Sequence, residues 1–153
     1  MQKHIRTFAI AFTLVATMST ASFAQKAAKE KSLYDRLRGK KAITAVVDEF
    51  VGRVAADNRI NGYFKATAAD PKRLATFKGS LVDQICQASG GSCRYKGKDM
   101  KSAHMEMGIS SADFNALVED LVGALDKFKV GPTEKDQLLG ALGPMKKDIV
   151  EMP

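Results

Sequence analysis

The sequence predicts an all-α protein with four long helices and two or three short ones. Apolar residues recur at three- and four-residue steps along most of the chain, which is the period of a helix with one buried face. No stretch alternates apolar and polar residues for long enough to indicate a strand. Glycine, proline and asparagine pairs separate the periodic stretches, so we expect sharp corners between the helices.

Residues 1–24 have the pattern of a secretory signal peptide. Lys3 and Arg6 precede an apolar run over residues 8–15, and Ser22-Phe23-Ala24 supplies the small residues of a cleavage site. The alternative, an uncleaved membrane anchor, is disfavoured because the apolar run is too short to span a bilayer. We therefore expect cleavage after Ala24, no stable membrane anchor afterwards, and a periplasmic or secreted protein.

The remaining chain fits one domain. Residues 25–31 are rich in lysine and alanine and have no apolar stripe, so we expect a flexible arm. Residues 32–153 have the length and patterning of a single domain with one core. The formal charge of the chain is +7. No basic run carries interleaved aromatic residues, so nucleic-acid binding is not expected.

The first elements are a short helix, a long helix and a corner. Ser32 can cap a helix over residues 33–37. The next helix, over residues 41–57, has an apolar stripe that includes Phe50 and Val51. Apolar residues 60–64 then pass through a turn, and residues 66–69 are expected to be a linker.

The second long helix begins at Asp70-Pro71, with Asp70 as the cap and Pro71 in the first turn. We expect it to continue to about residue 89, where Gly90-Gly91 stops it. Its inward residues are Leu74, Phe77, Leu81, Val82 and Ile85. An irregular loop over residues 92–98 then leads to a short helix that contains His104 and ends at Gly108.

Two further helices complete the chain. Ser110 and Asp113 form a capping-box pattern at the start of the most amphipathic helix. Its apolar residues are Phe114, Leu117, Val118, Leu121, Val122, Leu125 and Phe128. Gly131-Pro132 breaks this helix, and the last helix covers residues 133–150. Gly143-Pro144 is expected to kink or interrupt the last helix.

His104 is the candidate ligand, because it is the only histidine outside the first few residues. Imidazole is a common protein ligand for metals and for haem iron. On a helix, Met100 and Met107 would share the face of His104. Polarizable thioethers suit packing against a flat ring system. The alternative is a histidine on a short amphipathic helix that simply bonds a backbone carbonyl.

Cys86 and Cys93 are the only cysteines. No Cys-x-x-Cys-His pattern occurs, so covalent c-type haem is not indicated. In an oxidising compartment the two cysteines can form a disulfide. Two buried thiols that pack as small hydrophobes are an equally good interpretation, because sequence spacing does not establish the distance between them.

Five stretches in order resemble the group I truncated haemoglobins, also called two-over-two globins. They are residues 33–37, 46–54, 60–64, 90–97 and 100–109, so that the resemblance extends over about residues 32–151. Helix patterning alone leaves a four-helix bundle and a globin-like sandwich open. The resemblance implies a truncated globin-like two-over-two helical sandwich with haem between two antiparallel helix pairs. One departure is Arg38-Gly39, where the family often has Gly-Gly, and we expect Gly39 alone to suffice for the turn.

The resemblance also implies a non-covalent haem b whose iron is held by His104, with a diatomic gas (O2, NO or CO) opposite it. The residues expected to contact haem are His104, Phe64, Phe77, Leu81, Tyr95, Met100, Met107, Phe114, Leu117 and Val51. Phe64 would pack on the haem face, or alternatively only seal the core. Tyr95 would approach a propionate, or alternatively only anchor its loop.

The family usually has tyrosine after the phenylalanine of the first long helix, where this chain has Val51. Phe77 and Leu81 fall at the distal positions of the next long helix, where the family often has glutamine. We therefore expect an apolar distal pocket and no strong hydrogen bond to bound O2. This favours a gas-binding haem protein. The alternatives are a nitric-oxide dioxygenase or peroxidase-like enzyme served by an unidentified reductase, and a haem-free helical binding module.

Overall fold

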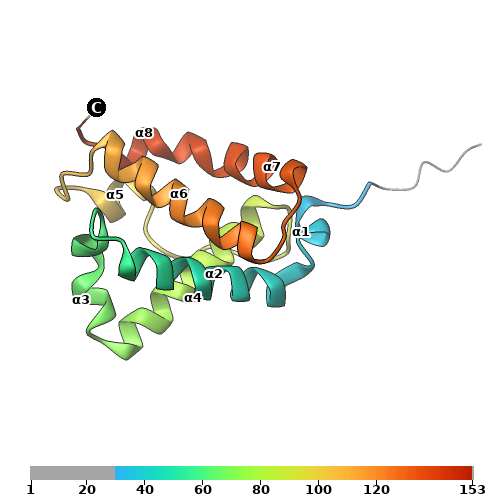
Figure 1. Ribbon diagram of the computed structural model, residues 1–153, viewed down its shortest axis with the longest axis horizontal. Coiled ribbons are helices and arrows are strands. Elements are labelled where there is room, and N and C mark those ends of the chain that lie inside the picture. Colours follow the sequence, from blue (N-terminus) through green and yellow to red (C-terminus); the bar gives the residue numbers. More distant parts are fainter. Residues whose placement is uncertain (1–29, 153) are drawn as a thin grey trace, which may run out of the picture.

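The computed structural model describes residues 30–152, so the predicted signal peptide and residues 25–29 of the predicted arm lie outside the described residues. The described chain contains helices and no β-strand, apart from one isolated bridge between Ser110 and Met152 (Figure 1). This confirms the predicted all-α class. The elements in chain order are α1 (Leu33–Arg36), α2 (Gly39–Ala56), the 3-10 helix η1 (Asn61–Phe64), α3 (Lys65–Ala68), α4 (Pro71–Ala88), α5 (Met100–His104), α6 (Ser111–Lys127), α7 (Pro132–Leu142), the 3-10 helix η2 (Gly143–Met145) and α8 (Lys146–Ile149).

The four long helices of the described chain form two antiparallel pairs, α2 with α4 and α6 with α7. Helix α2 packs against both α4 and α6, and α4 also packs against α7. In Figure 1, α6 and the α7–α8 segment run in opposite directions along one side of the molecule, while α2 and α4 lie on the other. The largest fully buried side chains come one from each long helix, and they are Val47, Cys86, Leu125 and Leu138. The core therefore lies where the two pairs cross.

The predicted helix ends agree with the observed caps. The Ser32 side chain accepts a hydrogen bond from the Asp35 amide, and Asp70 accepts from the amides of the first turn of α4. Ser110 and Asp113 form the predicted capping box of α6. Proline and glycine interrupt the last helix as predicted, because η2 separates α7 from α8.

Three local predictions were wrong. Residues 65–68 form α3 instead of a linker, because alanine favours helix and the segment continues directly from η1. Phe128 does not continue the buried stripe of α6: it is the C-cap residue, and 42% of it is exposed. Gly39 alone does not make its turn, because Arg38 also has a positive φ of 66°.

Within residues 30–152, no helix is both long enough and apolar enough to cross a membrane. Glu30 and Lys31, the two residues of the predicted arm that are described, are exposed and non-helical.

Candidate functional site

His104 is the last residue of α5, a five-residue helix whose N-terminus is capped by Asp99 through the Ser102 amide. The Nδ1 atom of His104 lies 2.7 Å from the carbonyl oxygen of Met100, one helical turn earlier. A carbonyl only accepts hydrogen bonds, so Nδ1 carries the ring hydrogen. Nε2 is then the ring nitrogen with an available lone pair, which is the arrangement that metal-bound histidines show.

The two methionines near His104 do not share one helix face as predicted. Helix α5 ends at His104, and Met105 leaves it in an extended conformation with ψ of 135°. The chain then reverses through Glu106 and Gly108, both with φ of 64°, so half-buried Met107 lies beyond the helix. Met100 does lie on α5, and its sulfur accepts a hydrogen bond from Gln84 of α4 at 3.3 Å.

The C-terminal segment holds the turn that follows His104. The two carboxylate oxygens of Glu151 accept hydrogen bonds from the backbone amides of Glu106 and Gly108, at 2.7 and 2.6 Å. The amides of Glu151 and Met152 in turn donate to the carbonyl of Ile109. The sequence gives no signal for this role of Glu151, because only the fold brings residue 151 to residue 106.

A small apolar cavity of about 30 Å³ lies between α2, η1, α3 and the start of α4. Two residues predicted for the distal side, Val51 and Phe77, line it together with Phe64, which was predicted to pack on the haem face. The Phe64 and Phe77 rings are tilted by 47° with centroids 5.6 Å apart. A site of roughly 10–15 Å³ holds one water molecule, so this cavity has room for a diatomic gas. Thr67 is the only lining residue with a polar side chain.

The remaining predicted contacts come from α4 and α6. Leu81 and Leu117 are half-buried and pack against the core. Phe114 is also half-buried, and the Lys146 ammonium lies 5.6 Å from its ring centroid. Neither these three residues nor Met100 lines the small cavity.

Gln84 is a polar residue that the sequence analysis missed on this side of α4. It lies three residues after Leu81 and seven after Phe77, a spacing that places it on the same helix face. Its Nε2 atom lies 3.3 Å from the Met100 sulfur and 3.4 Å from the Met145 sulfur. The two amide hydrogens of Gln84 are therefore directed to thioethers, and Gln84 is not among the residues that line the small cavity.

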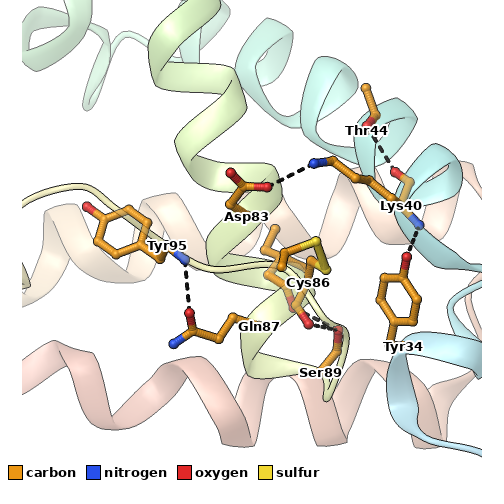
Figure 2. The surroundings of a disulfide bond; sticks show 10 residues. Tyr34, Lys40, Thr44, Asp83, Cys86, Gln87, Ser89 and Tyr95 are labelled. Carbon is orange, nitrogen blue, oxygen red and sulfur yellow. Dashed lines mark hydrogen bonds and ion pairs between the residues drawn. A yellow bond between two sulfur atoms is a disulfide. The ribbon is translucent and has the colours of Figure 1, made fainter.

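The loop between α4 and α5 is anchored at two points (Figure 2). Tyr95 donates its hydroxyl to the Lys98 carbonyl at 2.8 Å, and its backbone amide donates to Gln87 at 2.9 Å. Burial, assisted by the charge of Asp99, raises the pKa of the Tyr95 hydroxyl. These contacts match the loop-anchor interpretation of Tyr95, and its approach to a propionate stays a prediction.

The second anchor is a disulfide between Cys86 and Cys93, with a Cα–Cα distance of 5.7 Å. It joins the buried end of α4 to the loop that leads toward His104 (Figure 2). Gly91 lies tightly beside it, because a Cβ atom there would be only 2.6 Å from the Cys86 sulfur. Of the two interpretations that the spacing left open, the structure has the disulfide.

Residues 32–151 match the bacterial-like globin family. The group 1 truncated haemoglobin GlbN of Mycolicibacterium paratuberculosis is 33% identical over 122 residues, which cover 80% of this chain and 86% of that protein. This chain belongs to the truncated haemoglobins. The GlbN protein of Synechocystis is 35% identical over 65% of this chain and 79% of its own length.

Solved structures confirm the two-over-two fold of this truncated haemoglobin. The Fe(III) form of the truncated haemoglobin from Tetrahymena pyriformis superposes with a TM-score of 0.71 at 27% identity, covering 78% of this chain and 98% of that one. The two-over-two haemoglobin of Synechococcus, described as carrying covalently attached haem, gives the same TM-score at 31% identity, with the same shares covered. The predicted helical sandwich is therefore correct.

Proposed function

We propose that this truncated haemoglobin binds haem b without a covalent link and holds its iron through Nε2 of His104. The observation that carries the proposal is the hydrogen bond from His104 to the Met100 carbonyl, which leaves Nε2 as the free ligand atom. Haem would supply an iron that could bind both the histidine and a small ligand. The hydrogen bond from Nδ1 to the Met100 carbonyl orients the imidazole.

The surrounding residues fit a flat apolar ring. Phe64 and Phe77 present tilted rings at 5.6 Å, and the Met100 thioether extends from the same helix as His104. We expect Leu81, Met107, Phe114 and Leu117, which are all half-buried, to contact the ring. A non-covalent link is supported because, within residues 30–152, His104 is the only histidine and both cysteines are paired.

We further propose that a diatomic gas binds opposite His104 in the small apolar cavity. Val51 and Phe77 line that cavity and donate no hydrogen bond, and Gln84 directs its amide to the two sulfurs. A gas molecule there would be held by the iron and by packing. Acid–base chemistry of a peroxidase or a dioxygenase would need an acid–base group within reach. The lining has one polar side chain, the Thr67 hydroxyl, and no carboxylate or imidazole, so it supports reversible gas binding over a detoxification enzyme that is served by a reductase.

The disulfide supports the predicted export of the protein, because disulfides persist in oxidising compartments. We propose that the mature protein begins at Gln25 and functions in the periplasm or outside the cell. Mass spectrometry of the periplasmic fraction tests this proposal. A cytosolic protein that retains residues 1–24 would contradict it.

Gas titration of the haem-loaded mature protein separates the candidate functions. We expect the ferrous protein to bind one O2 or one CO reversibly, and to consume nitric oxide or peroxide only slowly in the steady state with a reductant. Rapid turnover of either substrate would favour the enzyme. A protein that binds neither gas although it is loaded with haem would contradict gas binding.

A further inference from the structure

A second and much larger cavity, of about 480 Å³, lies at the opposite end of the molecule from α5. It opens where α1, the start of α2, the end of α6 and the start of α7 meet, at the right of Figure 1. Small-molecule sites typically have about 300–1,000 Å³. This cavity shares no lining residue with the small distal cavity. Its floor is formed by the buried apolar side chains of Ile43, Val46, Ile85, Leu125 and Leu138.

Two cations at the mouth have strained backbones. Within residues 30–152, three non-glycine residues have a positive φ, and two of them, Arg38 (66°) and Lys129 (55°), line this cavity. Each directly follows the C-cap residue of a helix, where glycine is the unstrained choice. Strained residues of this kind concentrate at functional sites. Arginine and lysine at two positions suited to glycine therefore indicate a role for their side chains.

The mouth also has unbalanced positive charge. Its carboxylates are already engaged, since Glu134 pairs with Arg36 at 3.0 Å and Asp35 accepts from Ser32. No carboxylate in residues 30–152 forms a salt bridge with Arg38 or Lys129. Both cations are exposed, so they remain available to an anion from solution.

An exposed aromatic residue completes the mouth. Phe128 lines the cavity and is 42% exposed, so its ring is available at the mouth. The site thus combines an apolar floor, an aromatic edge and a cationic rim. A ligand that matches all three has an apolar tail and one anionic head.

We propose that this cavity binds a fatty-acid carboxylate, with its tail on the apolar floor and its head at Arg38 and Lys129. The segment that precedes the described residues is a poor match, because Gln25-Lys26-Ala27-Ala28-Lys29 is basic and would meet a basic rim. The head group lies at the surface, where ion pairs are weak, so the tail contributes most of the affinity. Each buried methylene group then strengthens binding by roughly fourfold.

Calorimetric titration of the haem-loaded mature protein tests this site, because haem then occupies the His104 side. We expect decanoate to bind with one-to-one stoichiometry and octanoate to bind about 15-fold more weakly, since it has two fewer methylene groups. The uncharged 1-decanol should bind roughly threefold to tenfold more weakly than decanoate, since each exposed ion pair contributes less than about 1 kcal/mol. The Soret band should not change during the titration.

Three variants locate the ligand. Arg38→Gly combined with Lys129→Gly should weaken decanoate binding roughly threefold to tenfold, to the affinity of 1-decanol. It should also raise the thermal midpoint, because both substitutions relieve strain. Ala42→Leu should weaken binding by narrowing the cavity that Ala42 lines. Glu106→Gly is the matched control: it relieves the third positive φ outside the cavity and should leave decanoate affinity unchanged.

Several results would overturn the proposal. They are the absence of decanoate binding, equal affinity for decanoate and 1-decanol, and full affinity in the double glycine variant. Binding that disappears when haem is added would place the fatty acid in the haem site instead. If decanoate binds to a chain that starts at residue 30 but not to the mature chain, then residues 25–29 themselves occupy the cavity.

Discussion

Nδ1 of His104 and the carbonyl oxygen of Met100 lie 2.7 Å apart within the single turn of α5. The partner that orients the imidazole is therefore part of the same short helix, and the helix must itself be held in place. Asp99 caps its N-terminus, and Glu151 bonds the turn that follows its C-terminus. The position of His104 thus depends on residues at both ends of α5.

Glu151→Ala should loosen the segment that follows His104. The substitution removes the acceptor of two backbone hydrogen bonds, and we expect a loss of about 1–2 kcal/mol in the free energy of unfolding. Haem release should become faster, and the iron–histidine stretching band should broaden or shift. Glu151→Gln keeps one carbonyl oxygen and should have a smaller effect. An unchanged iron–histidine band in Glu151→Ala would show that the C-terminal segment does not position His104.

Val51→Tyr should slow O2 release from the haem-loaded protein by roughly ten- to a hundredfold. Bound O2 carries partial negative charge, and a hydroxyl donor in the distal cavity would stabilise it by roughly 1–3 kcal/mol. CO is less polar, so its release should change less. Flash photolysis and stopped-flow mixing measure both rates.

Val51→Phe is the control for this experiment, because it adds the ring without the hydroxyl. If Val51→Phe slows O2 release as much as Val51→Tyr does, then cavity volume and not hydrogen bonding controls the rate. Slow O2 release in the unmodified protein would contradict the apolar distal pocket itself.

Reduction of the Cys86–Cys93 disulfide should lower the free energy of unfolding by about 2–3 kcal/mol, because the bond closes a loop with a sequence separation of 7. Urea denaturation with and without a thiol reductant measures the change. The double variant Cys86→Ala and Cys93→Ala should unfold as the reduced protein does and should not respond to reductant. Equal stability of the oxidised and reduced proteins would refute this role of the bond.

The Tyr63 hydroxyl donates to the Asp113 carboxylate at 3.1 Å and so joins η1, which carries Phe64, to the start of α6. Hydrogen bonds from Ser110, with a smaller contribution from Tyr63, hold the pKa of Asp113 below its usual 3.8. A lowered carboxylate pKa stabilises the fold above pH 3.8, and this stabilisation is lost as the pH falls through the folded pKa.

Tyr63→Phe should therefore lower the thermal midpoint at pH 7, and its difference from the unmodified protein should shrink as the pH falls below about 3.8. Thermal unfolding from pH 7 to pH 2.5 measures this difference. A difference that stays constant over that range would mean that the Asp113 carboxylate is not the partner that matters.

The sequence predicted the parts of the fold that depend on local chemistry. Helical spacing and caps located the long helices, since Ser110 and Asp70 act on amides two or three residues away. Gly143-Pro144 predicted the break before α8, because proline interrupts a helix through its own local geometry. That Val51, Phe64 and Phe77 face the interior was also predictable, because each lies on the inward face of a recognisable element, and the three line one small cavity.

The predictions that failed or stayed open depend on tertiary context. Helix α5 ends at His104, and Glu151 accepts two hydrogen bonds from the turn that follows. The sequence pattern over residues 100–107 gives no information about this contact with residue 151. The disulfide stayed open because it needs the loop to fold back on α4. Gly39 alone was expected to make the turn between α1 and α2, yet Arg38 also adopts a left-handed conformation in this short connection.

Titration of the purified mature protein with haemin, followed by its visible spectrum, tests the central claim most directly when it is done beside His104→Gly. We predict that the unmodified protein gains a sharp Soret band that saturates at one haemin per chain. His104→Gly should bind haemin weakly, and added imidazole should restore the spectrum by replacing the missing ligand. A colourless unmodified protein, or a His104→Gly variant with unchanged affinity and spectrum, would contradict the assignment of His104 as the haem ligand.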